Sequence, residues 1–283
     1  MTATPSRVIL CPMDKNENVT TIVITGSTRG IGYGLADSFL SLGCSVTISG
    51  RAAANVEQVV EKLSSKHETA RVLGHPCDVT QFEQVQALWD AAKARFGKVD
   101  IWINNAGISH PQMDFCDYAS GQIKAIVDTN LVGAMNGAKV ALKGMLEQGH
   151  GSLYNMEGLG SNGRKVAGMT LYGCTKYGLS YLTDALVDET KGTPVLVGAL
   201  QPGMVATDLL TQQYKDRPEQ WERDKRIFNI LSDRVETVTP WLAQRVLANR
   251  KTGVRIKWLT RTKLMGRFLT APFHKRDVFG QVG

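Results

Sequence analysis

The sequence lacks several features that define common classes of protein. Its five cysteines are odd in number and scattered, without a C-x-x-C pair: Cys11, Cys44, Cys77, Cys116 and Cys174. This spacing argues against a disulfide framework and against a zinc or other metal site of clustered ligands, and it indicates a reducing compartment. No apolar run approaches the roughly 18 residues of a membrane span. The N-terminus shows no basic segment followed by an apolar stretch, so we expect no secretory signal and a cytoplasmic protein.

Charge and composition narrow the choice further. Lys and Arg total 33 against 26 Asp and Glu, and the formal net charge of +7 favours anionic ligands or surfaces. No RNA-binding aromatic signature or zinc-finger spacing accompanies this charge, so we expect no nucleic-acid partner. A length of 283 residues and a hydrophobic content of 43% suit one α/β domain of ordinary globular composition.

A glycine-rich stretch near the N-terminus, TIVITGSTRGIGYG, is the strongest local signal. Residues 21–25 are all β-branched, which is typical of a strand buried on both faces of a parallel sheet. Gly26, Gly30 and Gly32 follow, and a helical pattern begins at Ile31. Glycines allow such a tight turn and let the backbone approach a phosphate at the helix N-terminus. The stretch therefore predicts a dinucleotide-binding turn between a strand and a helix.

Further strands and helices alternate along the chain. We expect strands at 44–49, 71–76, 99–103, 151–156, 195–200 and 253–259, and helices at 53–66, 81–96, 120–147 and 170–190. Such alternation implies βαβ units with right-handed crossovers and a parallel sheet covered on both faces. Residues 1–18 form an expected tail, and residues 19–283 a single domain.

One tyrosine and one lysine have the spacing of an acid–base pair. Tyr172 and Lys176 are four residues apart, which places them on one face of the expected helix. A nearby ammonium favours the phenolate, so we expect the pKa of Tyr172 to lie closer to neutrality than usual. Such pairs are common on solvated helices, so the spacing is weak evidence without the other motifs.

Together, these motifs resemble the short-chain dehydrogenase/reductase family. The resemblance rests on TGSTRGIG, on NNAG at 104–107, on Asn130 in the next helix, on Y-x-x-x-K and on PGMVATD, and it runs from Val19 onward. It implies a Rossmann-type doubly wound sheet with strand order 3-2-1-4-5-6-7. It also implies a homo-dimer or homo-tetramer built on the helices that contain Asn130 and Tyr172.

The resemblance also implies roles for individual residues. The implied cofactor-binding positions are Gly26, Ser27, Thr28, Arg29, Gly30, Ile31, Gly32, Arg51, Asp78, Val79, Asn105, Ala106, Gly107, Tyr172, Lys176, Pro202, Gly203, Val205 and Thr207. Tyr172 would exchange the proton of the substrate oxygen, Lys176 would hold the nicotinamide ribose, and Asn130 would support a relay water.

The family's serine is missing from the expected fifth strand. The family pattern is N-[IV]-S-S, whereas this chain has Asn155, Met156, Glu157 and Gly158. Ser161 lies just downstream, either as a substitute or as an ordinary loop serine. The segment NMEGLGSNGR, with RIKWLT near the C-terminus, resembles the chlorophyll b reductase branch of the family.

This branch implies reduction of the C7 formyl group of chlorophyll b or chlorophyllide b to a hydroxymethyl group. Two alternatives stay open: a reductase of another bulky hydrophobic aldehyde or ketone, and a non-catalytic regulatory protein that binds NADP(H).

Three interpretations are open for Glu157. A protonated Glu157 in a low-dielectric pocket could donate to the formyl oxygen. An ionised Glu157 could bind the magnesium of the pigment, which accepts carboxylate oxygen. Alternatively, the side chain points into solvent beside Arg164 or Lys165.

Arginines, rather than an acid, mark the expected adenosine end of the cofactor site. An NAD-specific site usually has Asp or Glu at the end of the second strand, where this chain has Arg51, with Arg29 in the glycine turn. Two guanidinium groups can bind a 2′-phosphate, so we predict NADPH. The alternative is that Arg51 simply begins the next helix in solvent.

The C-terminal third contains two segments of expected function. Residues 209–239 stand at the substrate-lid position of the family, where we expect helices over the site. Residues 250–276 mix basic and apolar side chains, which suits contact with an anionic membrane surface and its lipophilic pigment. The alternative for this segment is that its apolar residues belong to the core.

Overall fold

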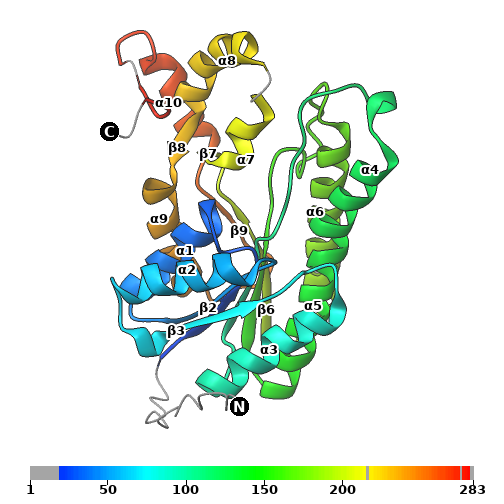
Figure 1. Ribbon diagram of the computed structural model, residues 1–283, viewed down its shortest axis with the longest axis vertical. Helices are drawn as coiled ribbons and strands as arrows, with labels where there is room; N and C mark the ends of the chain where they lie inside the picture. The colour runs from blue at the N-terminus through cyan, green and yellow to red at the C-terminus, as the bar shows by residue number, and fades with distance from the viewer. Residues whose placement is uncertain (1–18, 215–216, 275, 281–283) are drawn as a thin grey trace, which may run out of the picture.

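The computed structural model describes residues 19–214, 217–274 and 276–280; the expected tail, 1–18, lies outside them. A seven-stranded, entirely parallel sheet forms the centre, in the order β3-β2-β1-β4-β5-β6-β9 (Figure 1). The strands are β1 (Thr21–Ile24), β2 (Ser45–Gly50), β3 (Val72–Pro76), β4 (Ile101–Asn104), β5 (Gly151–Met156), β6 (Val195–Gln201) and β9 (Arg255–Lys257). The predicted fold class and strand order are confirmed, and β9 is the seventh strand.

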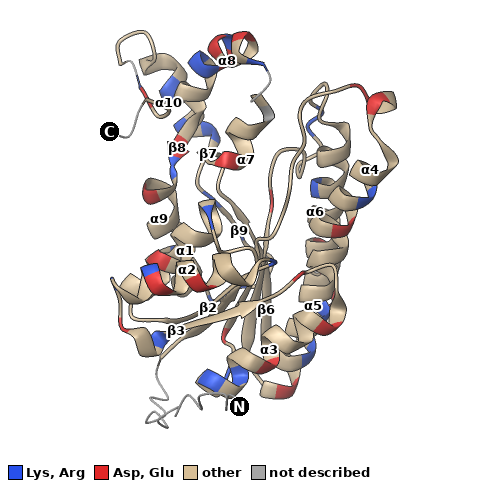
Figure 2. Cartoon of the chain, viewed as in Figure 1, with Lys and Arg blue, Asp and Glu red and all other residues tan. Residues whose placement is uncertain are grey.

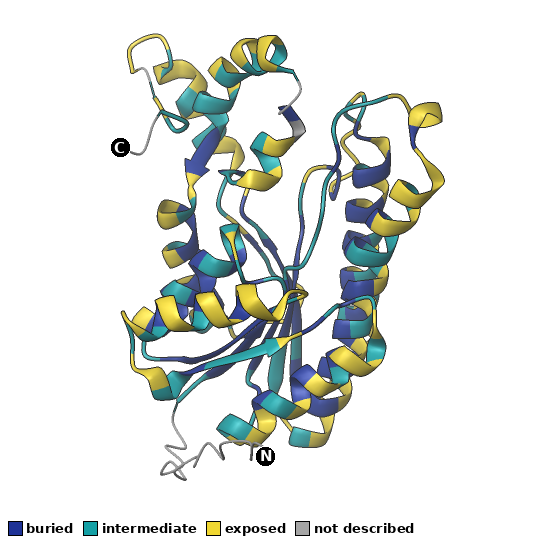
Figure 3. Ribbon diagram, viewed as in Figure 1, coloured by how far each residue is buried: buried dark blue, intermediate teal, exposed yellow. Residues whose placement is uncertain are grey.

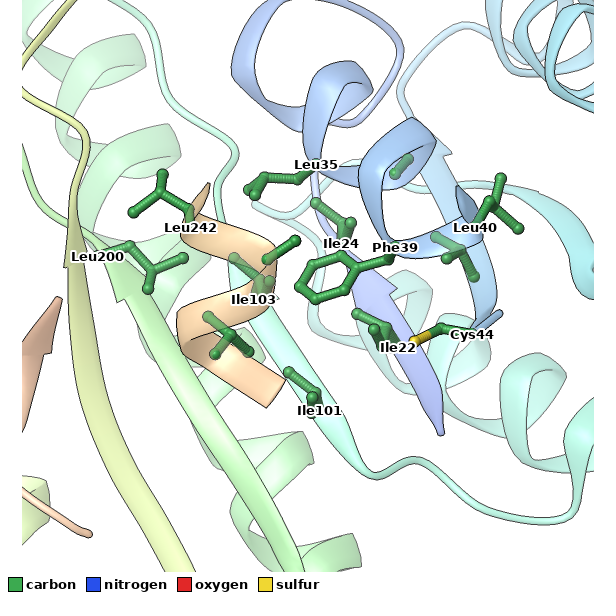
Figure 4. Close-up of a cluster of buried hydrophobic side chains, with 14 of the residues drawn as sticks. Ile22, Ile24, Leu35, Phe39, Leu40, Cys44, Ile101, Ile103, Leu200 and Leu242 are labelled. Atoms are coloured by element: carbon green, nitrogen blue, oxygen red, sulfur yellow. The ribbon is translucent and has the colours of Figure 1, made fainter. Parts of the chain in front are cut away.

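The apolar side chains of the strands point alternately to the two faces of the sheet, and each face has its own hydrophobic core. Ile22 and Ile24 of β1 point to one face of the sheet, where they pack with Leu35 and Phe39 (Figure 4). Three helices cover this face: α1 (Gly30–Ser41), α2 (Ala53–Ser64) and α9 (Val235–Ala248). Because side chains alternate along a strand, Val23 points to the opposite face.

The opposite face is covered by α3 (Phe82–Phe96), α5 (Gly133–Gln148) and α6 (Thr170–Glu189). Trp89 of α3 and Trp102 of β4 meet there, with ring centroids 6.1 Å apart. Among the described strands of the central sheet, only β9 contains charged residues, and most charges lie on the helices and loops (Figure 2). The strands of the sheet other than β9 are therefore uncharged, as coverage on both faces requires.

The helix expected over residues 120–147 is interrupted. It consists of α4 (Ser120–Val127), a π-helical turn over Asp128–Val132, and α5. A π-turn inserts one extra residue into a helix and is frequent at functional sites. Asn130 lies within this turn and is 1% exposed.

Apart from α9 and β9, the segments after β6 stand beyond the carboxyl ends of the central strands (Figure 1). They include the expected helices, α7 (Asp208–Thr211) and α8 (Pro218–Leu231), and also α10 (Arg261–Thr270). An unpredicted two-stranded parallel sheet joins β7 (Met204–Ala206) to β8 (Ser232–Arg234). Short 3₁₀ segments occur at Thr69–Arg71, Phe115–Asp117 and Gln212–Tyr214.

The C-terminal segment is only partly core. Ile256 of β9 is buried, as that alternative expects. However, the apolar side chains along and after α10 are exposed, and Figure 3 shows this helix as largely solvent-facing: Met265 (64%), Phe268 (46%), Leu269 (72%) and Phe273 (83%). The core alternative is wrong for these four residues, because α10 packs through its other side. None of the helices in the described ranges combines the length and hydrophobicity that a membrane crossing needs.

Candidate active site

The glycine turn is pressed against the loop that follows β4. Gly26 has a φ of +62°, and a Cβ atom on it would lie only 2.8 Å from the Cα of Ala106. The side-chain amide of Asn105 donates to the carbonyls of Thr25 (2.9 Å) and Gly26 (3.0 Å). Ala106 and Asn105 both donate their backbone N–H to the Thr25 hydroxyl. The NNAG segment therefore holds the turn in place, and glycine is required at position 26.

The turn fits the pyrophosphate of a dinucleotide. Helix α1 begins at Gly30, and Arg29 at its N-cap provides no side-chain hydrogen bond to the helix. The first amides of α1 thus keep the capacity to bind an anion. Thr207 lies opposite, since a Cβ on Gly30 would be 3.4 Å from its Cγ2 atom. The end of the predicted segment Pro202–Thr207 therefore lies directly against the turn.

Other predicted cofactor residues have structural contacts of their own. The Ser27 hydroxyl is buried, donates to the carbonyl of Ile24 (2.8 Å) and accepts from the N–H of Ser49 (2.9 Å). It therefore joins the ends of β1 and β2. The Asp78 carboxylate accepts from the backbone N–H and the hydroxyl of Thr80. Ile31 is half-buried and packs against the core on the α1 side.

The two predicted 2′-phosphate ligands are exposed. Arg51 directly follows β2, and Arg29 directly precedes α1. Arg29 also lies 4.0 Å from the carboxylate of Asp208, and both side chains are about two-thirds exposed. Such an exposed pair is weak, so it leaves Arg29 available to a stronger anion.

Tyr172 and Lys176 are both buried near the start of α6. The Lys176 ammonium donates to the Met156 carbonyl (2.9 Å) and lies 5.7 Å from the centroid of the Tyr172 ring. Burial raises the pKa of Tyr172 to about 12 and lowers the pKa of Lys176 to about 8. The expectation of a tyrosine pKa close to neutrality is therefore wrong for this structure. Loss of solvation dominates at Tyr172, and the ammonium is directed at a carbonyl instead.

Asn130 links the NNAG loop to α6. Its side-chain oxygen accepts from the Ile108 N–H (2.8 Å), and its amide donates to the Ile108 carbonyl (2.9 Å) and the Thr175 hydroxyl (3.2 Å). A Cβ on Gly107 would lie 3.3 Å from the Asn130 oxygen and 3.7 Å from the Lys176 nitrogen. The predicted Asn130, Gly107 and Lys176 thus meet at one place.

Gly158 occupies the space beside the tyrosine hydroxyl. A Cβ on this residue would lie 2.8 Å from the Tyr172 Oη atom. The hydroxyl of Ser161 accepts from the Gly158 N–H (2.9 Å), and Ser161 is 5% exposed. Ser161 is therefore buried in the same tight turn and does not lie in solvent.

The side chain of Glu157 is fully buried, so the solvent-facing interpretation is wrong. Its carboxylate accepts from the Arg255 Nε atom (3.2 Å) and from the side-chain amide of Gln201. Both carboxylate oxygens thus already accept from protein side chains in the interior. These contacts favour neither the proton-donor nor the magnesium interpretation.

The sequence analysis missed a buried histidine at this site. His110 accepts from the Tyr172 N–H through Nε2 (3.2 Å) and contacts the Tyr118 hydroxyl through its ring nitrogens. It is 4% exposed and fixes the first turn of α6 against the NNAG loop. The signal in the sequence that could have identified His110 is its position three residues after NNAG.

Comparisons with known proteins agree with this architecture. The family model for short chain dehydrogenase matches residues 20–218. A probable chlorophyll(ide) b reductase, NYC1, of Oryza sativa subsp. japonica is 34% identical over 278 residues, covering 93% of this chain and 54% of the relative. The chlorophyll(ide) b reductase NOL of the same organism is 35% identical, covering 80% of this chain and 66% of the relative. This chain thus spans about half to two thirds of the length of these relatives.

A solved structure with the same fold is the 3-ketoacyl-(acyl-carrier-protein) reductase from Brucella melitensis complexed with NADH. It is 26% identical and has a TM-score of 0.71, with 84% of this chain and 96% of that chain covered. The glycine turn, the NNAG loop and the Tyr172–Lys176 pair lie on this shared fold. The chain therefore belongs to the short-chain dehydrogenase family.

Proposed function

We propose that this protein is an NADPH-dependent reductase of the C7 formyl group of chlorophyll b or chlorophyllide b. The supporting observation is the reach of its similarity to chlorophyll(ide) b reductases. That similarity covers 93% of the chain, whereas the family model ends at residue 218. It therefore includes the C-terminal third, which the shared cofactor motifs do not explain.

The residues around Tyr172 suit the reductive direction. A tyrosine with a pKa of about 12 is protonated at neutral pH, so it can donate a proton to the carbonyl oxygen as that oxygen gains charge. Asn130 holds the NNAG loop against α6, and the buried Ser161 hydroxyl is our candidate for the missing serine. The lid at 209–239 would cover the bound substrate.

The nicotinamide cofactor would supply the hydride when it is bound. The turn from Gly26 to Gly32 would hold its pyrophosphate, Lys176 its nicotinamide ribose, and Arg29 and Arg51 a 2′-phosphate. Asp78, Val79 and Asn105–Gly107 would border the adenosine half, and Pro202–Thr207 the carboxamide. Family membership supports a nicotinamide cofactor, and the two arginines support NADPH over NADH.

Two surfaces support proposals about partners. Tyr177 (60% exposed) and Tyr181 (76% exposed) project from α6, and with α5 they suit a homo-dimer or homo-tetramer.

The second surface is formed by α10. The Asp233 carboxylate accepts hydrogen bonds from Arg267 and Arg276 and so holds α10 with its apolar side outward. Lys257 and Arg261, just before and at the start of α10, are exposed and basic, so this surface suits an anionic membrane.

The test is an anaerobic incubation with NADPH and chlorophyll b or chlorophyllide b, followed by pigment chromatography. We expect a 7-hydroxymethyl product, and a loss of about 10²-fold or more in Tyr172→Phe, because general acid catalysis contributes on that order. Tyr177→Phe is the matched control on the exposed side of α6. Tight NADPH binding without product would favour another bulky aldehyde or ketone as the substrate. NADPH binding without turnover on any carbonyl would favour a regulatory protein.

A further inference from the structure

A charge network that runs from the buried Glu157 to the exposed Asp184 connects β9 to the candidate catalytic helix. Arg255 donates from Nε to Glu157, and from Nη2 to both carboxylate oxygens of Asp184 (2.8 Å each) and to the Ser180 hydroxyl (3.1 Å). Arg255 thus joins the residue after β5 to the outer part of α6. Without Arg255, the Glu157 carboxylate would be a buried and uncompensated charge, which is strongly destabilising.

The network extends to Lys176 through the backbone around Glu157. The Lys176 ammonium donates to the carbonyl of Met156, which belongs to the peptide bond preceding Glu157. On the other side, a Cβ on Gly158 would lie 3.5 Å from the Lys176 Cε atom. Lys176 is therefore in contact with both neighbours of Glu157, while the Glu157 side chain turns to Arg255.

The charges around Glu157 favour a protonated Lys176. Arg255 divides its hydrogen bonds between the buried Glu157 and Asp184, whose side chain is 59% exposed, so it is not reserved for the Glu157 carboxylate. The Lys176 ammonium is a second positive group that interacts with Glu157. Burial lowers the pKa of Lys176, and the charge of Glu157 opposes that effect. Tyr172, whose ring lies near the ammonium, is neutral below its pKa of about 12, and Gln201, which contacts Glu157, is uncharged.

We propose that Glu157 is a positioning residue whose negative charge, held in place by Arg255, keeps Lys176 charged and hydrogen-bonded to the Met156 carbonyl. This rests on the proposed function only in assigning Lys176 to the cofactor ribose. It also accounts for glutamate where the family pattern has serine: the side chain acts on Lys176 and touches no substrate.

The test follows Lys176 directly and needs neither pigment nor NADPH. Lysine labelled with ¹³C at Cε reports protonation by NMR, and Lys176→Arg identifies the resonance. In the parent protein we expect a midpoint of about 8. In Glu157→Gln we expect the midpoint to fall by about one pH unit or more, the usual effect of losing an adjacent opposite charge. Glu157→Asp keeps the charge, so the Lys176 midpoint of this variant should lie close to that of the parent protein.

Two further variants separate this role from general effects. Glu189→Gln removes the same charge from an exposed position on α6 outside the network, and it should leave the midpoint unchanged. Arg255→Gln removes the compensating cation, so the midpoint should move upward, opposite to Glu157→Gln. An unchanged midpoint in Glu157→Gln, or a lower one in Arg255→Gln, would overturn the proposal. If the Lys176 midpoint shifts as expected but the protein does not reduce the pigment, the role of Glu157 is retained and only the proposed substrate is refuted.

Discussion

Replacing Gly158 with alanine adds one methyl group beside the Tyr172 hydroxyl. The added Cβ would lie 2.8 Å from Oη, which is 0.6 Å short of the 3.4 Å at which ordinary contact begins. Tyr172 is buried, and its N–H is bonded to His110, so the ring has little freedom to retreat. We therefore expect the hydroxyl to be displaced by roughly half an ångström.

Misplacing a reacting group by about 1 Å can cost on the order of 10²-fold in rate. For Gly158→Ala we accordingly expect turnover to fall by about 10- to 100-fold, or about 1.4–2.7 kcal/mol in the activation free energy. Binding of NADPH should change little, because the added methyl group is directed at the tyrosine. Steady-state kcat and a fluorescence titration of NADPH measure the two quantities separately.

The matched control is Gly173→Ala, one residue after Tyr172 on α6. A Cβ there meets nothing within 4 Å, so turnover should be retained, and the helix should gain about 0.5–1 kcal/mol from the better helix former. Full turnover in Gly158→Ala would refute the inferred contact. An equal loss of turnover and of NADPH affinity would place the disturbance in the cofactor site instead.

Two more outcomes follow from exposed residues. Arg51→Asp should reduce the preference for NADPH over NADH by about 10- to 100-fold in kcat/KM, because a charge-assisted hydrogen bond is replaced by repulsion. Lys66→Asp, beyond the opposite end of α2, is the control, and an unchanged preference in Arg51→Asp would exclude Arg51 as a phosphate ligand. Leu269→Glu should weaken co-sedimentation with anionic vesicles by about tenfold, whereas Leu42→Glu, at the exposed C-cap of α1, should not. Co-sedimentation that does not depend on anionic lipid would disprove the membrane contact.

The sequence predicted what depends on local pattern and on repeated βαβ units. Apolar strands such as β1 and the stripe on α3 determine which faces are buried, and the handedness of crossovers then leaves few strand orders. The site motifs follow strands whose carboxyl ends share one edge, so their proximity was also predictable. The three-residue strands β7 and β8 were not, because so short a segment has no periodicity.

Glu157 shows why the remaining part of the site required the structure. Its partner Arg255 is 98 residues away, and they meet only because β9 pairs with β6. No pattern near Glu157 indicates that pairing. The pKa of Tyr172 also could not be predicted from its four-residue spacing to Lys176, because it depends on burial and on the direction of the Lys176 ammonium.

The π-helical turn around Asn130 makes the orientation of the Asn130 amide independent of the packing of α5. In a regular helix the two would be coupled. Before the turn, α4 contacts α6; after it, α5 packs on the sheet and on α3. The extra residue in the turn lets Asn130 face Ile108 and Thr175 while the rotational phase of α5 is chosen by its own contacts. Substitutions that repack α5 can therefore accumulate without rotating the amide. Deleting one residue from Asp128–Val132 would restore a regular helix, and α5 could then keep its phase only by turning Asn130 away.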